Sequence, residues 1–225
     1  MMSTRGLLIA VEGIECVGKT PMARTLASLL TAKGYDTIYT YEPTNGPYGK
    51  LIRFLLKRVM RESWHWERAL LFALDRAWHV SNVINPLLKR GLIIVCDRYI
   101  HSQLAYQAAE GLPMDFIEKL NMEFPPPDIV VFLDSNPKYV VERLSFLKRK
   151  GNISKSSVYD DEAFLSAVRS FYFKYLRDSR FTKEYLIINI DEEIGRGYIS
   201  DDEFNRRVLT IAERTVSFVT NRVGR

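Results

Sequence analysis

The sequence has no long apolar run and only two cysteines. A membrane-spanning helix needs about 20 apolar residues, and the apolar stretch that starts at Leu7 is too short for a secretory signal. We therefore expect a cytoplasmic protein without a membrane partner. Disulfides are rare in that compartment, so Cys16 and Cys96 are predicted to be free thiols.

Charge does not select one class of partner. Lys and Arg number 32 against 27 Asp and Glu, which gives a net charge of +5 and an isoelectric point near 9.1. This balance suits a nucleic-acid-binding protein, and it suits equally an enzyme that acts on polyanionic nucleotides. The sequence lacks basic repeats interleaved with aromatic residues, so we expect no nucleic-acid partner.

Five apolar runs of strand length alternate with longer segments of helical period. They cover residues 7–11, 37–41, 92–96, 129–133 and 186–190. Because the runs are continuously apolar, each strand is expected to be buried on both faces. The prediction is an α/β fold: an open, parallel five-stranded sheet covered by helices on both faces, in one domain over residues 1–225.

The phosphate-binding motif G-x-x-x-x-G-K-[ST] occurs at residues 13–20, between the first predicted strand and a helix that begins near Pro21. Its glycines let backbone N–H groups converge on phosphate oxygens at a helix N-terminus. Lys19 is expected to reach the β and γ phosphates, and Thr20 to contact Mg²⁺. The motif predicts a P-loop NTPase fold that uses ATP and Mg²⁺, with the ATP phosphates held by Gly13, Cys16, Val17, Gly18, Lys19, Thr20 and Pro21.

A second polar pair follows the predicted strand at 92–96. Asp97 comes at the carboxyl end of that strand, where open α/β sheets bind ligands. We therefore expect Asp97 to share the Mg²⁺ site with Thr20. Arg98 follows directly, and its guanidinium is suited to grip phosphate oxygens and stabilise the transferred group.

Several segments resemble thymidylate kinases in sequence, order and spacing. They are residues 11–15, 42–43, 71–76 and 97–107, and a further likeness at 127–143 extends the resemblance over roughly residues 7–176. The resemblance implies transfer of the ATP γ-phosphate to dTMP, which gives dTDP and ADP for dTTP synthesis. It also implies a homodimer packed through helices.

The same resemblance implies roles for individual residues. Glu15 is similar in position to the acidic residue that holds the acceptor 3′-hydroxyl, Phe72 to the aromatic that stacks on thymine, and Arg76 to the donor to a base carbonyl. Phe72 and Arg76 share one helix face at i, i+4, although spacing alone also allows simple core packing of Phe72. The remaining predicted acceptor contacts are Pro43, Arg53 at the phosphate, Arg98, Ser102, Gln103, Gln107, and Tyr106 beside the 2′ position.

Residues 143–159 resemble the lid that closes over ATP in such kinases and excludes water. Cys16 stands where some members carry an arginine, so the lid is expected to supply that positive charge. Arg149 is the predicted catalytic cation, with Lys148 and Arg143 as alternatives. Pro21 and Val158 depart from residues often found in the family, which affects the expected contacts of the loop and lid.

Two other functions fit parts of the sequence. A deoxynucleoside kinase needs a carboxylate base, which Glu42 could provide, and a non-catalytic nucleotide-binding protein or ATPase fits the basic charge. An acceptor phosphate needs no strong base because its oxygen is already ionised near neutral pH, so positioning carries the catalysis. No Ser-His or Cys-His pattern suggests a nucleophile, and His65, His79 and His101 are expected to be packing or surface residues.

Overall fold

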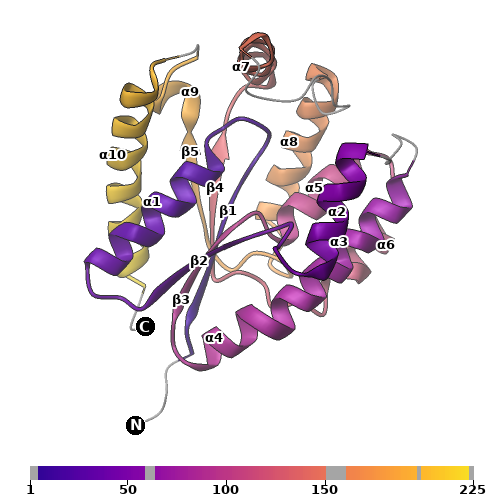
Figure 1. Cartoon of the computed structure of the whole chain (residues 1–225), viewed down its shortest axis with the longest axis horizontal. Helices are drawn as coiled ribbons and strands as arrows, with labels where there is room; N and C mark the ends of the chain where they lie inside the picture. The colour runs from indigo at the N-terminus through magenta and orange to yellow at the C-terminus, as the bar shows by residue number, and fades with distance from the viewer. Residues whose placement is uncertain (1–4, 59–63, 151–160, 197–198, 223–225) are drawn as a thin grey trace.

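The computed structural model describes residues 5–58, 64–150, 161–196 and 199–222. Within them, five parallel strands form one sheet in the order β2-β3-β1-β4-β5 (Figure 1). The predicted sheet is thereby confirmed, with strand boundaries that differ by at most two residues. The strands are β1 Leu7–Gly13, β2 Thr37–Tyr41, β3 Ile93–Asp97, β4 Ile129–Asp134 and β5 Tyr185–Asn189.

Helices cover both faces of this sheet, and β1 shows how the sequence divides between them. Ile9 and Val11 pack in one core with the helices α1 and α10, whereas Leu8 and Ala10 pack in another with α4 and α5. Alternate side chains of a strand point to opposite faces, so a continuously apolar strand serves two cores. The covering helices are α1 Lys19–Ala32, α4 Asn85–Lys89, α5 Ile100–Ala109, α8 Glu162–Leu176 and α10 Asp201–Thr220.

The two outer strands correct one prediction. β1, β3 and β4 are almost wholly buried, as expected, but Ile38 of β2 is 39% exposed and Ile187 of β5 is 41% exposed. The reason is the strand order, which puts β2 and β5 at the edges of the sheet. Apolar composition alone did not distinguish a central strand from an edge strand.

A second group of helices lies beyond the carboxyl ends of the strands and to one side of the sheet (Figure 1). Asn136 caps α7 by accepting from the Lys138 backbone N–H at 3.0 Å, and Pro137 occupies the first turn of the helix. The predicted lid begins in α7, while residues 151–160, including Val158, lie outside the described residues. The group comprises α2 Pro47–Arg58, α3 His65–His79, a π-helical turn at Val80–Ile84, α6 Met114–Asn121, α7 Pro137–Arg149 and the short α9 Ile190–Glu193.

Cys16 and Cys96 are free thiols, as expected. Among the described helices, none combines the length and the apolar composition needed to cross a membrane.

Candidate active site

The phosphate motif forms a tight loop between β1 and α1, and its glycines are required by geometry. Gly13 has φ +148°, and a Cβ there would stand 2.5 Å from the Leu133 carbonyl oxygen. Gly18 has φ +88° and immediately precedes the first residue of α1. Cys16 also has a positive φ, at +50°. The loop therefore wraps the N-terminus of α1, where backbone N–H groups and the helix dipole favour an anion.

Lys19 and Thr20 begin α1 at the floor of this loop. The Lys19 ammonium is buried and donates to the Ile14 carbonyl. Burial, reinforced by the charge of Arg98, lowers the pKa of Lys19 to about 8. The negative charge of a bound polyphosphate would favour the protonated ammonium and raise the pKa of Lys19 again.

The Thr20 hydroxyl donates to Asp97 Oδ2 at 2.5 Å, which joins the start of α1 to the end of β3. Two oxygen groups thus meet beside the phosphate loop, at the carboxyl edge of the sheet. No cluster of three His, Cys, Asp or Glu suited to a metal occurs in the described part of the chain. One carboxylate and one hydroxyl fit Mg²⁺, which takes most of its remaining oxygen ligands from water and substrate phosphates.

Arg98 follows Asp97 with φ +66°, in the left-handed region that few non-glycine residues adopt. Its guanidinium donates to Glu15 Oε1 at 2.9 Å and to Ser102 Oγ at 3.2 Å. It also lies 5.6 Å from the centre of the Tyr106 ring. Burial opposes ionisation of Glu15, but Arg98 and Lys19 outweigh it and hold the pKa of Glu15 below its ordinary value. Glu15 is therefore a half-buried, ionised acceptor.

Glu12, which no sequence pattern assigned to the site, fixes the turn that carries Arg98. Its Oε1 accepts from the Tyr99 backbone N–H at 2.7 Å, and its Oε2 accepts from the hydroxyls of Ser102 at 2.7 Å and Tyr172 at 3.0 Å. Burial raises the pKa of Glu12, although these hydrogen-bond donors act to lower it. A charged residue inside an otherwise apolar strand was the one signal available in the sequence.

A cavity of about 200 Å³ opens beside Glu15 and Arg98. It brings together predicted residues from the phosphate loop, from α3 and from α5, which are far apart in the sequence. Its wall also contains Glu42, Leu56 and Tyr99, to which the sequence had assigned no place in this pocket. The predicted residues that line it are Glu15, Pro43, Phe72, Arg76, Arg98, Ser102, Gln103, Tyr106 and Gln107; we call it the acceptor cavity.

Two amides on α5 differ in how they are used. Gln103 accepts from Arg76 through Oε1 and donates to the Ala69 carbonyl at 2.8 Å through Nε2. In contrast, Gln107 Oε1 is buried and has no hydrogen-bond partner among the described residues. A buried acceptor without a donor is costly, so the lining of the cavity calls for an N–H or O–H group from a ligand.

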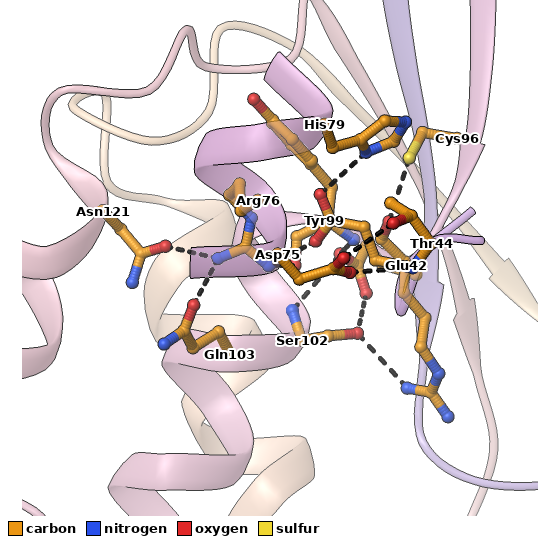
Figure 2. Close-up of polar contacts among 12 residues, drawn as sticks. Glu42, Thr44, Asp75, Arg76, His79, Cys96, Tyr99, Ser102, Gln103 and Asn121 are labelled. Carbon is orange, nitrogen blue, oxygen red and sulfur yellow. Dashed lines mark hydrogen bonds and ion pairs between the residues drawn. The ribbon is translucent and has the colours of Figure 1, made fainter. Parts of the chain in front are cut away.

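Arg76 is held more tightly than its predicted role requires (Figure 2). Nη1 donates to Gln103 and, at 2.5 Å, to Asn121 Oδ1, while Nη2 donates to Glu42 Oε2 at 2.6 Å and to the Tyr99 carbonyl at 3.0 Å. The four Nη hydrogens are therefore already used by the protein. Nε is buried and has no partner among the described residues. An acceptor base can use an Nη donor of Arg76 only by sharing or replacing one of these bonds.

A larger cavity of about 590 Å³ covers the phosphate loop, and Glu15, Glu42, Pro43 and Arg98 line both cavities. Arg53 lies in this second cavity and not in the acceptor cavity. Its guanidinium donates to the Pro43 carbonyl at 2.6 Å and to Asn45 Oδ1 at 2.9 Å. The shared wall makes the two cavities neighbours, as transfer between two bound molecules requires. The other lining residues are Cys16, Gly18, Lys19, Thr20, Pro21, Arg24, Tyr39, Tyr41 and Asp97.

A third cavity, of about 240 Å³, lies on the other side of Cys16 and Gly18, between α7 and the start of α10. Of the three lid cations considered, Arg143 lines it, and its guanidinium is paired with Asp191 at 3.1 Å. Arg143 Nη1 also lies 3.5 Å from the Cys16 carbonyl oxygen. Arg149 is exposed in the last turn of α7.

Comparison with known proteins gives one consistent result. The sequence model of the family described as thymidylate kinase matches residues 11–196. A probable thymidylate kinase of Pyrococcus abyssi is 39% identical over 190 residues, which cover 82% of this chain and 88% of the relative. One of Thermococcus gammatolerans is 34% identical over 218 residues, 94% of this chain and 98% of the relative. A thymidylate kinase of Xylella fastidiosa strain M23 is 40% identical over 139 residues, 62% and 63% of the two chains.

The matched span runs from within β1 to just beyond α9 and contains the lining of both the acceptor cavity and the phosphate-loop cavity. The resemblance expected from short motifs thus extends through the whole region that builds the site. The chain belongs to the thymidylate kinase family.

Proposed function

We propose that this enzyme transfers the γ-phosphoryl group of ATP to dTMP and releases dTDP and ADP. The observation that carries this proposal is the shared wall of two cavities, in which Glu15 and Arg98 face both the phosphate loop and an aromatic-lined acceptor cavity. An enzyme that joins two anionic nucleotides needs such an arrangement, because catalysis of phosphoryl transfer consists mainly of positioning and charge stabilisation.

On the donor side, residues 13–20 hold the ATP phosphates, and Lys19 neutralises the β and γ oxygens. Thr20 and Asp97 are the proposed ligands of Mg²⁺, which supplies further charge neutralisation on the transferred group. Arg98 donates to the same group from the acceptor side. Attack comes from an ionised oxygen of the acceptor phosphate, so no protein base takes part.

On the acceptor side, Phe72 of α3 is proposed to stack on the base, and the unpartnered Gln107 Oε1 to accept from the N3–H of thymine. Cytosine has an acceptor at that ring position, so this contact disfavours dCMP. Glu15 accepts from the 3′-hydroxyl, and Tyr106, whose hydroxyl lies 3.3 Å from Glu15 Oε1, limits space at the 2′ position. Arg53 is the proposed contact of the acceptor phosphate.

The position of Glu42 argues against a deoxynucleoside kinase. Its carboxylate is buried and accepts from Arg76 at 2.6 Å and from His79 at 3.0 Å. Although burial favours the protonated form, Arg76 and His79 keep the pKa of Glu42 below its ordinary value. A carboxylate tied to two donors and low in pKa is a poor base for a nucleoside hydroxyl.

The remaining proposals concern the chain as a whole. It acts in the cytoplasm as one kinase domain over residues 1–225, with a lid at about 143–159 from which Arg149 reaches the transferred group. It forms a homodimer through α2 and α3, which pack on each other. Trp66, Leu70 and Leu74 support this, because they form an exposed apolar stripe at i, i+4 and i+8 on α3.

The test is an ADP-release assay with ATP, Mg²⁺ and a panel of acceptors: dTMP, dUMP, dCMP, dGMP, AMP, UMP, thymidine and none. We expect dTMP to be the best acceptor and Lys19→Ala to abolish release. Release with thymidine but not with dTMP would assign the chain to nucleoside phosphorylation. Equal release without any acceptor would rule out both kinase functions.

A further inference from the structure

Arg76 lines the acceptor cavity, and the orientation of its guanidinium is set by its neighbours. A guanidinium is planar, so the acceptors bonded to its Nη atoms fix both its plane and the edge that it turns to the cavity. Of the four acceptors, Glu42 is the only charged one, and it forms the ion pair at 2.6 Å. The orientation of Arg76 therefore depends most strongly on the orientation of Glu42.

Glu42 is in turn held in place through its second carboxylate oxygen, Oε1. Oε2 accepts from Arg76, and Oε1 lies 3.0 Å from Nδ1 of His79, whose side chain is wholly buried (Figure 2). An ionised carboxylate only accepts hydrogen bonds. His79 must therefore carry a hydrogen on Nδ1 and donate it. Without this donor, Oε1 of the buried Glu42 carboxylate would have no hydrogen-bond partner among the described residues, and only Oε2 would be paired.

Thr40 completes the chain of contacts at the edge strand β2. Its Oγ1 lies 2.7 Å from Nε2 of His79. A neutral imidazole with its hydrogen on Nδ1 accepts at Nε2, so the Thr40 hydroxyl donates there and favours this tautomer. With this tautomer, Thr40 donates to His79, His79 donates to Glu42, and Glu42 accepts from Arg76.

We propose that His79 is a positioning residue for recognition of the acceptor base. It lines none of the three cavities described above, so it acts through Glu42 and Arg76 and not by contact with a nucleotide. The proposal rests on the proposed function only in taking dTMP as the acceptor. Lys19, Thr20 and Asp97 lie outside this chain of contacts, at the phosphate loop. Loss of His79 should therefore weaken base binding and base discrimination and leave phosphoryl transfer nearly intact.

Three substitutions separate a positioning role from a packing role. His79→Leu removes both ring nitrogens, His79→Asn keeps an N–H donor near the place of Nδ1, and Thr40→Val removes only the hydroxyl that sets the tautomer. The measurements are kcat and KM for dTMP and for dCMP at saturating ATP, together with the KM for ATP and the melting temperature of each variant. Each substitution thus has a kinetic and a structural readout.

For His79→Leu we expect the KM for dTMP to rise about tenfold or more, with kcat within about threefold of wild type. The preference for dTMP over dCMP in kcat/KM should fall about tenfold, because a misdirected Arg76 no longer donates to the thymine carbonyl in whose place cytosine carries an amino group, and Gln107 alone then discriminates. His79→Asn should recover most of both losses. Thr40→Val should lie between His79→Asn and His79→Leu, and the KM for ATP should be unchanged in all three.

His101→Leu is the matched control, since His101 is also wholly buried, but its Nε2 contacts Thr182 Oγ1, at 2.6 Å, and not Glu42. It should lower the melting temperature without changing the KM for dTMP or the base preference. The proposal is overturned if folded His79→Leu keeps wild-type values, or if His79→Asn is no better than His79→Leu. If His79→Leu does not fold, wild-type base preference in both His79→Asn and Thr40→Val overturns it.

Failure of the proposed function gives a different result. In that case the wild-type enzyme itself is inactive with dTMP and selects another acceptor from the panel. The variants are then compared on that acceptor, and an unchanged KM in His79→Leu still overturns the positioning role.

Discussion

The Glu15 carboxylate and the Arg98 guanidinium are joined by a hydrogen bond of 2.9 Å, although 83 positions separate the two residues. The pair lies in the wall shared by the acceptor cavity and the phosphate-loop cavity. Each residue therefore orients the other at the point where the two nucleotides must meet. We therefore expect the rate of phosphoryl transfer to depend on the geometry of the Arg98 guanidinium as well as on its charge.

Arg98→Lys tests that expectation, because lysine keeps the charge but loses the planar fork. We expect kcat with dTMP to fall about a hundredfold, as when one stabilising donor is removed from an active site. The KM for ATP should change little, since the phosphate loop is untouched. A kcat within threefold of wild type would contradict a role for the planar guanidinium in stabilising the transition state of phosphoryl transfer.

Phe72→Ala tests stacking in the acceptor cavity. Stacking of a base on an aromatic side chain is worth about 1–3 kcal/mol, so the KM for dTMP should rise roughly five- to 150-fold while the KM for ATP stays constant. Leu209→Ala, an exposed apolar residue on α10, is the control and should be neutral. If Phe72→Ala leaves the KM for dTMP unchanged, Phe72 only packs, as the apolar residues around it also allow.

Local signals predicted the strands and the phosphate loop because these depend on short stretches of sequence. Residues 13–20 contain everything that the loop needs: two glycines with positive φ, the lysine and the threonine. The five apolar runs located the sheet to within two residues, although their edge or central position depended on strand order. The α/β fold was therefore readable almost completely from local pattern.

The contacts within the site were less predictable, since they join segments that are distant in sequence. The sequence places Arg76 one helical turn from Phe72, but its bond to Asn121 on α6 depends on how α3 and α6 pack. Likewise, Arg53 bonds to Pro43 and Asn45 because of the turn before α2. Motifs predicted most of the side chains that line the two cavities, whereas tertiary packing decided how many of their donors remain for a substrate.

His101 should make the protein less stable in acid. The ring is wholly buried with Nε2 2.6 Å from Thr182 Oγ1, and burial, followed by the charge of Arg76, lowers the pKa of His101 to about 3. In the unfolded chain its pKa is about 6.5. Between these values the unfolded state binds the extra proton, so this contribution to stability is complete above pH 6.5 and is lost as the pH falls toward 3.

At pH 5 the loss amounts to about 2 kcal/mol, from 1.5 pH units at 1.36 kcal/mol each. Urea unfolding of the wild type and of His101→Asn at pH 7 and pH 5 measures it. The variant should be less stable at pH 7 but should lose about 2 kcal/mol less than wild type on acidification. Equal losses in the two proteins would show that His101 is not the group responsible.

The homodimer prediction depends on Leu70, at the middle of the α3 stripe. Trp66, Leu70 and Leu74 are 49%, 48% and 45% exposed, and such a stripe is expected to be covered in solution. Leu70→Asp would bury a carboxylate in that interface, so sedimentation should show a dimer for wild type and a monomer for the variant. Leu209→Asp, at a site 42% exposed on α10, should remain dimeric. The opposite face of α3 carries Arg76 of the acceptor cavity. If the interface holds α3 in place, the monomeric variant should also bind dTMP more weakly. A wild-type protein that sediments as a monomer would exclude this interface.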